Sequence, residues 1–335
     1  MNRLQNREVG VDVAKVVAMF LVVLLHVSGY IGSEGAFIHS FSYCCIDVFA
    51  LASGYLCLNT TWRFAKIFQL WLQTIFWGVV VLSICKVACY EVHLKDVLDV
   101  LLPVSRYSYW YFTSYTLLFF VMPLLNAAIK NMTKKEFQYA ISAIFILACM
   151  TSLFEGDICY LGQGYSFAWL AILYVAGGYL RLYQPIGWRS STCFIVAFIS
   201  VLLGFSLGLL FEATGFHHPG EKIRLAVSYV SPFTVIQAIF IFVGCQHLKI
   251  HNACVVKLLK MLSVSTFGVY LIHVQPFFFK NVWPQLFGGV SSCSEWKLVL
   301  IEVFLSLAIY VGCSFLELIR IKLFDFCYKV FSRNK

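Results

Sequence analysis

The fold follows first from residues 11–31, VDVAKVVAMFLVVLLHVSGYI, an apolar run long enough to cross a bilayer as one helix. Three ionisable side chains interrupt this run, at Asp12, Lys15 and His26. Because a helix turns about 100° and rises about 1.5 Å per residue, Lys15 and His26 lie about 20° apart around its axis and about 16 Å apart along it. Asp12 falls near the same stripe, so we expect the helix to turn one polar face toward its neighbours.

Ionisable groups at membrane depth cost roughly a few kcal/mol each, which makes a function the default interpretation and structural pairing the alternative. We assign a function to His26. For Asp12 and Lys15 both interpretations stay open, because an ion pair within the helix, near the membrane surface, explains them equally well.

The composition of the 335-residue chain indicates a membrane protein with many spans. Hydrophobic residues make up 61% of it and charged residues only 12%, which is more apolar surface than a soluble domain can bury. The net charge of +9 does not indicate nucleic-acid binding, because the basic residues lie in short loops and do not alternate with exposed aromatics. The thirteen cysteines contain no C-x-x-C pair, so neither a disulfide framework nor a zinc site is expected.

The apolar runs predict an all-α protein with about ten transmembrane helices, at about 11–31, 41–59, 65–85, 108–128, 137–153, 166–183, 192–211, 227–247, 260–279 and 297–316. With the N-terminus in the cytoplasm, 17 Lys and Arg fall inside and seven outside, while Lys15 lies within the first span. The positive-inside rule therefore predicts that both termini are cytoplasmic. No loop is long enough for a second domain, so residues 1–335 are expected to form one membrane domain.

A second polar position lies in the second predicted span, where Asp47 belongs to the run from Ile46 to Leu56. Counted from the outer ends of their spans, Asp47 and His26 lie at similar depth. A carboxylate beside an imidazole fixes its tautomer and raises its basicity, so we expect Asp47 to orient His26. In the same run, Ser53-Gly54 would permit close approach of another helix.

The remaining candidates lie toward the two opposite sides of the membrane. Arg63 and Lys66 open the third span on the cytoplasmic side; they either mark topology by snorkelling or hold phosphate groups. His273, in the ninth span, and Glu302, in the tenth, fall in the outer half with His26. For His273 a function and a structural hydrogen bond are equally open, whereas for Glu302 pairing with a neighbour is favoured over catalysis.

Taken in order, these motifs resemble those of the membrane-bound acyltransferase family 3, which O-acylates cell-surface and secreted glycans in bacteria and other molecules elsewhere. The first helix of that family carries a basic residue, ten intervening residues and a histidine, with an Asp three residues before the basic one; these match Lys15, His26 and Asp12. Its second helix carries a Val-Asp-Leu-Phe-Phe-Val-Leu-Ser-Gly-Phe-like run, matched by residues 46–56.

Later motifs agree as well. Basic residues at the start of the third helix match Arg63 and Lys66, the aromatic entry and later Pro of the fourth match Trp110-Tyr111 and Pro123, and a late Tyr-Leu-Ile-His matches residues 270–273. Two positions depart from the pattern: Tyr109 stands where a histidine is often found, and Ala50 replaces a Phe. Substrate details of the family therefore do not carry over directly.

The resemblance implies an O-acetyltransferase of the inner (cytoplasmic) membrane, of the stand-alone type without a hydrolase-like domain. It would move acetyl from cytoplasmic acetyl-CoA to a hydroxyl of a lipid-linked or cell-surface glycan. The expected site residues are His26, Asp47 and His273 for catalysis, with His26 as the base and His273 in reserve, and Lys15, Arg63 and Lys66 for the CoA donor. We expect Arg63 to contribute more to CoA binding than Lys66.

Other classes of protein stay open on the sequence alone. A proton-coupled transporter or flippase of a glycan or lipid-linked precursor could use His26, Asp47 and His273 as its polar path. A scaffold subunit of a glycan-assembly complex would tolerate replacement of His26. The lipid bilayer is an expected partner in every case, a homo-oligomer is one alternative for the assembly, and direct transfer and an acyl-enzyme are equally open.

Overall fold

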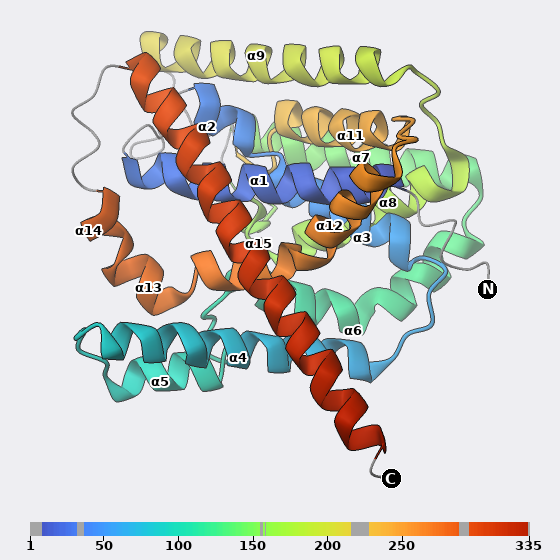
Figure 1. Cartoon of the computed structure of the whole chain (residues 1–335). Helices are drawn as coiled ribbons and strands as arrows, with labels where there is room; N and C mark the ends of the chain where they lie inside the picture. Colours follow the sequence, from blue (N-terminus) through green and yellow to red (C-terminus); the bar gives the residue numbers. More distant parts are fainter. Residues whose placement is uncertain are drawn as a thin grey trace.

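The computed structural model describes residues 9–31, 37–154, 157, 159–215, 228–287 and 295–333. In these ranges the regular structure is entirely helical (Figure 1). The helices are α1 (Val9–Ile31), α2 (Phe37–Ser42), α3 (Cys45–Cys57), α4 (Phe64–Val87), α5 (Leu94–Leu101), α6 (Trp110–Asn131), α7 (Lys134–Phe154), the 3-10 turn η1 (Gly162–Gly164), α8 (Phe167–Tyr183), α9 (Ser190–Thr214), α11 (Pro232–Gln246), α12 (Ala253–His273), α13 (Pro276–Asn281), α14 (Trp283–Phe287) and α15 (Glu295–Arg333).

Seven helices within the described ranges are long and apolar enough to cross a membrane: Val9–Ile31, Phe37–Cys57, Phe64–Val87, Trp110–Asn131, Ser190–Thr214, Ala253–His273 and Lys297–Cys327. The predicted spans at 166–183 and 227–247 correspond to the shorter apolar helices Phe167–Tyr183 and Pro232–Gln246. The predicted span at 137–153 lies within α7. An all-helical protein with several membrane spans is thus confirmed, while the count of ten stays a prediction.

Helix boundaries differ from the prediction around the ninth span. We expected 260–279, but α12 begins at Ala253, where the Asn252 side chain accepts hydrogen bonds from the backbone N–H groups of Cys254 and Val255. It ends at His273, because Pro276 cannot continue the helix and instead opens α13. His273 therefore lies at the end of its helix rather than in the interior of a span.

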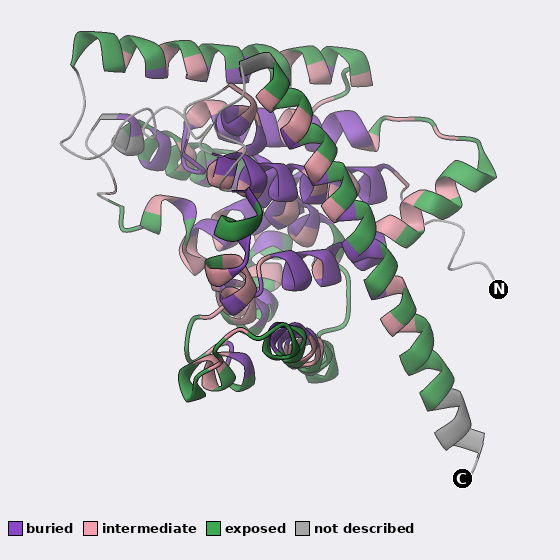
Figure 2. Ribbon diagram, turned by 60° about the vertical axis from the view of Figure 1, so that its left-hand side comes forward, coloured by how far each residue is buried: buried purple, intermediate pink, exposed green. Residues whose placement is uncertain are grey.

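Helix α1 lies at the centre of the bundle. It packs against α3, α11, α12 and α15, and these contacts bury most of its length, whereas α9 and much of α15 expose their outer faces (Figure 2). In a central, buried helix, polar groups at membrane depth can find protein partners on several sides.

Two glycines set the distance between α3 and α8. A Cβ atom at Gly54 would overlap the carbonyl oxygen of Tyr174, and one at Gly177 would overlap that of Leu51. Both helices therefore approach backbone to backbone, as expected from Ser53-Gly54. This close contact brings the first turns of α8 against the first turns of α3, where Asp47 lies.

The topology gives a direct prediction. Arg63 and Lys134 should face the cytoplasm and the Asp157 loop the outside, because two spans, α4 and α6, separate the first two positions and α7 separates the last two. The predicted outer position Glu221 lies outside the described residues.

Single cysteines in a chain stripped of its own cysteines would be labelled in intact cells with a membrane-impermeant reagent. The outer probe belongs at Tyr160, which is 90% exposed, because the Asp157 carboxylate accepts hydrogen bonds from the backbone of Leu161, Gly162 and Gln163. We expect labelling at position 160 and none at 63 or 134. Labelling of position 134 from outside would contradict this arrangement.

Candidate active site

The spacing predicted that α1 turns one polar face toward a neighbour, and the structure shows that this neighbour is α12. Near the start of α1, Lys15 Nζ donates a hydrogen bond to the carbonyl oxygen of Ser263 at 3.1 Å. The Ser263 hydroxyl in turn donates to Asp12 Oδ1 at 2.6 Å. Further along the same two helices, His26 meets His273. The three ionisable groups of α1 thus share one helical neighbour.

The two histidines form a hydrogen-bonded pair whose proton positions follow from its partners. His26 Nδ1 lies 3.1 Å from His273 Nε2, and His273 Nδ1 lies 2.6 Å from the carbonyl oxygen of Val269. A carbonyl oxygen can only accept, so His273 carries its proton on Nδ1 and its Nε2 accepts from His26 Nδ1–H. In the neutral pair, the lone pair on His26 Nε2 is therefore left available for a substrate proton.

Asp47 does not occupy the place we expected beside His26. It is fully buried, and its Oδ1 accepts a hydrogen bond from Trp169 Nε1 of α8 at 3.0 Å. Among the described residues, its Oδ2 has no hydrogen-bond partner. Similar depth in two helices does not fix which faces meet, and α3 turns Asp47 toward α8. The structure gives the position next to His26 to His273 instead.

A small cavity, here named the inner cavity, lies along the polar face of α1. Its volume is about 180 Å³, and its lining includes Lys15, Val22, Tyr111, Tyr115 and Tyr270. Val22 stands one helical turn before His26, and the Tyr270 ring centroid is 6.5 Å from that of His273. The inner cavity therefore extends from Lys15 to Val22 and Tyr270, which are neighbours of the histidine pair, while neither histidine belongs to its lining.

A larger cavity, the mouth cavity, adjoins it. Its volume is about 600 Å³, and Leu70 and Tyr115 line both spaces. Lys66 belongs to its lining, but Arg63 does not: it is the exposed N-cap residue of α4. Arg320 of α15 is also in the lining. In the sequence, Arg320 was one of the 17 Lys and Arg assigned to the cytoplasmic side, because nothing in the local sequence indicates that it lines a cavity.

Aromatic rings from α1, α13 and α14 pack around the histidine pair. The Phe279 ring packs edge-on against His26 with centroids 5.3 Å apart, and it contacts Tyr30 and Trp283. The Trp283 ring lies 6.3 Å from His273. These residues did not enter the sequence-based site, because their aromatic character is indistinguishable there from ordinary membrane-interface anchoring.

The structure also shows where Tyr109 and Glu302 lie. Tyr109, at the site where a histidine was expected from the resemblance, is buried and donates a hydrogen bond to the Leu271 carbonyl oxygen at 3.2 Å. It thereby holds the last turn of α12, close to His273. Glu302 is fully buried on α15.

Comparison with known proteins adds one finding. A family model described as an acyltransferase domain matches residues 8–318, which is nearly the whole chain. No curated protein and no solved structure matches the chain.

Proposed function

The chain belongs to acyltransferase family 3, and on that premise we propose that it transfers acetyl from acetyl-CoA to a hydroxyl of a lipid-linked or cell-surface glycan. The observation that carries the proposal is the hydrogen-bonded pair of His26 and His273, which neighbours Val22 and Tyr270 of the inner cavity. An enzyme is favoured over a proton-coupled transporter by the family match.

The two cavities suit the phosphates, the pantetheine arm and the thioester of acetyl-CoA. Lys66 and other polar groups of the mouth cavity would receive the phosphates, and the narrower inner cavity would receive the pantetheine arm. The separation of about 16 Å along α1 from Lys15 to His26 is comparable with the reach of that arm. The thioester would then lie next to His26 Nε2.

This arrangement supports direct transfer from acetyl-CoA to the acceptor. His26 Nε2 takes the proton of the acceptor hydroxyl while the hydroxyl oxygen attacks the thioester carbonyl carbon. The resulting tetrahedral intermediate collapses with cleavage of the C–S bond, and His26 returns the proton to the departing sulfur of CoA. His273 accepts from His26 Nδ1–H throughout, so the imidazole keeps its orientation when Nε2 gains the proton.

The acceptor would approach along the aromatic rings beside the histidine pair. Tyr30 and Phe279 are half-buried there, and the buried Trp283 packs against both; aromatic rings offer a large apolar surface. A sugar ring, with apolar C–H faces and hydroxyl edges, fits this chemistry.

The test uses purified protein in liposomes with acetyl-CoA and a lipid-linked glycan. We expect release of free CoA only when the glycan is present, together with a mass increase of one acetyl group on the glycan. CoA release that is independent of glycan, or an unmodified glycan, would contradict the proposal.

The two cytoplasmic cations should contribute unequally to donor binding. Lys66→Gln should weaken acetyl-CoA binding about tenfold, since a hydrogen bond to a charged group is worth about 1.5–3 kcal/mol. Arg63→Gln should weaken it by less than about threefold, because an exposed charge outside the cavity is screened. This reverses the order expected from the sequence.

Calorimetry in detergent would measure both affinities. Lys130→Gln, which removes an exposed cation at the end of α6, is the matched control and should bind normally. A larger loss in Arg63→Gln than in Lys66→Gln would restore the original order.

A further inference from the structure

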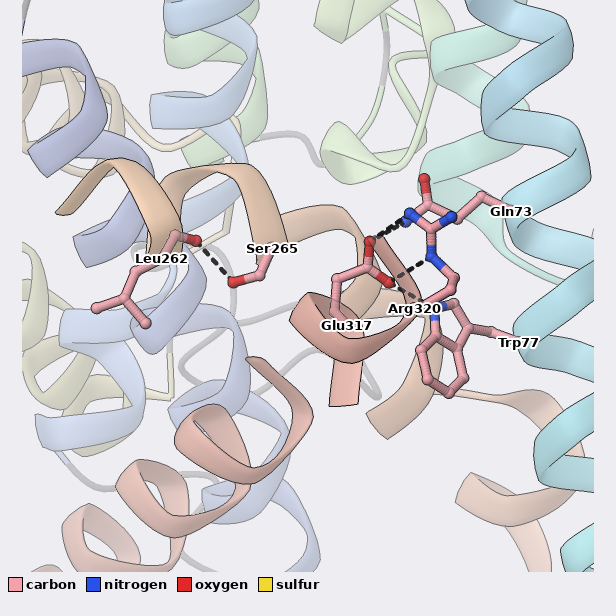
Figure 3. Close-up of polar contacts among 6 residues, drawn as sticks. All are labelled: Gln73, Trp77, Leu262, Ser265, Glu317 and Arg320. Atoms are coloured by element: carbon pink, nitrogen blue, oxygen red, sulfur yellow. Dashed lines mark hydrogen bonds and ion pairs between the residues drawn. The ribbon is translucent and has the colours of Figure 1, made fainter. Parts of the chain in front are cut away.

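The mouth cavity contains a cation that is fixed in place by protein contacts alone. Arg320 donates two hydrogen bonds to Glu317, from Nε to Oε2 at 2.9 Å and from Nη2 to Oε1 at 2.6 Å (Figure 3). This is the two-pronged geometry in which a guanidinium matches a carboxylate. The Arg320 side chain is only 14% exposed, so its orientation is set before any ligand binds.

Two other helices, α4 and α12, hold Glu317 in place. Gln73 Nε2 donates to its Oε1 at 3.1 Å and Trp77 Nε1 to its Oε2 at 2.7 Å, both from α4 (Figure 3). Its carboxylate also packs against α12 at Gly268, where a Cβ atom would overlap it. A carboxylate with four donors and 1% exposure cannot turn away from Arg320.

The pairing leaves much of the guanidinium unused. An arginine has five N–H donors, and the contacts to Glu317 take Nε–H and one hydrogen on Nη2. The other three N–H groups have no hydrogen-bond partner among the described residues, and Arg320 lines the mouth cavity together with Lys66. A buried ion pair gives little net stability compared with apolar side chains of the same size. Stability alone is therefore a poor reason to place one here.

We propose that Arg320, oriented by Glu317, binds a phosphate group of the CoA donor opposite Lys66. This inference rests on the proposed function and adds to it a contribution from the last helix. The pre-set orientation lowers the entropy lost on binding. The one acid of the lining, Asp325, is exposed on the next turns of α15, so the phosphate belongs on the side of Gln73 and Lys66.

The experiment measures displacement of labelled acetyl-CoA, in neutral detergent, by CoA and by adenosine 3′,5′-bisphosphate, which has phosphates but no pantetheine arm. Arg320→Gln should weaken both competitors about ten- to a hundredfold. Lys322→Gln makes the same charge change at an exposed position of the same helix outside the lining, and it should leave both unchanged.

Two measurements separate a loss of phosphate binding from damage to the fold. Transfer from acetyl-pantetheine, which has no phosphate, should proceed at the same rate in wild type and Arg320→Gln. The double variant Glu317→Gln, Arg320→Gln removes the buried unpaired carboxylate and should regain thermal stability without regaining CoA affinity. Equal loss of transfer with both donors, or recovery of affinity in the double variant, would overturn the inference.

A lipid headgroup offers the same phosphate chemistry, so phosphatidylglycerol is added in a parallel series. If it displaces acetyl-CoA from wild type but not from Arg320→Gln, Arg320 binds lipid and the inference is wrong. Normal CoA binding by Arg320→Gln also overturns it while leaving the proposed function intact. If wild type itself binds no acetyl-CoA, the donor assignment fails first.

Discussion

His26→Gln should abolish acetyl transfer, with the rate falling about 10²- to 10⁴-fold, the range that a positioned general base contributes. A neutral imidazole can take a proton on Nε2 and return it, whereas an amide cannot. Glutamine keeps a polar side chain of similar reach that can still hydrogen-bond to His273. The fold and acetyl-CoA affinity should therefore stay close to wild type, and the loss should appear in kcat.

The measurement is single-turnover transfer in liposomes, with acetyl-CoA binding and thermal unfolding measured in parallel. His39→Gln is the matched control, because His39 is another buried histidine next to α1 and its hydrogen bond to Ser28 can be kept by an amide. It should retain transfer. If His26→Gln transferred at the wild-type rate while His273→Gln did not, the base would be on α12.

The sequence predicted which residues belong to this site better than it predicted which of them contact one another. Eleven-residue spacing fixes the azimuth of Lys15 and His26 on one helix, and the structure confirms that both contact a single neighbour, α12. Which helix supplies that neighbour depends on packing between segments about 250 residues apart, for which a single sequence carries no direct signal. Depth counting therefore selected Asp47, whereas the structure supplies His273.

Local sequence signals did contain part of the missing information. Pro276 marks the end of α12, and with it the position of His273 on the last helical turn, but the apolar run continues past it through Phe277, Phe278 and Phe279. Hydropathy alone therefore extended the span. For Arg320, by contrast, the decisive fact is the shape of the mouth cavity, which forms only when α4, α6 and α15 meet.

Replacement of His273 should have the second largest effect on the transfer rate, because this residue orients His26. His273→Leu removes the acceptor for His26 Nδ1–H, so the imidazole can adopt the tautomer with its proton on Nε2, which is useless as a base. We expect kcat to fall by about 10²-fold or more with little change in KM for acetyl-CoA. His273→Gln supplies an amide oxygen that can accept the same hydrogen bond, so it should recover a part of the rate.

Asp47→Asn provides the contrast that separates orientation from general packing. The asparagine oxygen can still accept the hydrogen bond from Trp169, so this variant should keep most of the transfer rate, and any cost should appear in thermal stability. A merely structural His273 predicts the opposite pattern, with His273→Leu losing stability and both kinetic constants together and His273→Gln no better. If Asp47→Asn lost transfer as fully as His273→Leu while remaining folded, the carboxylate would have to act on His26 in a conformation other than this one.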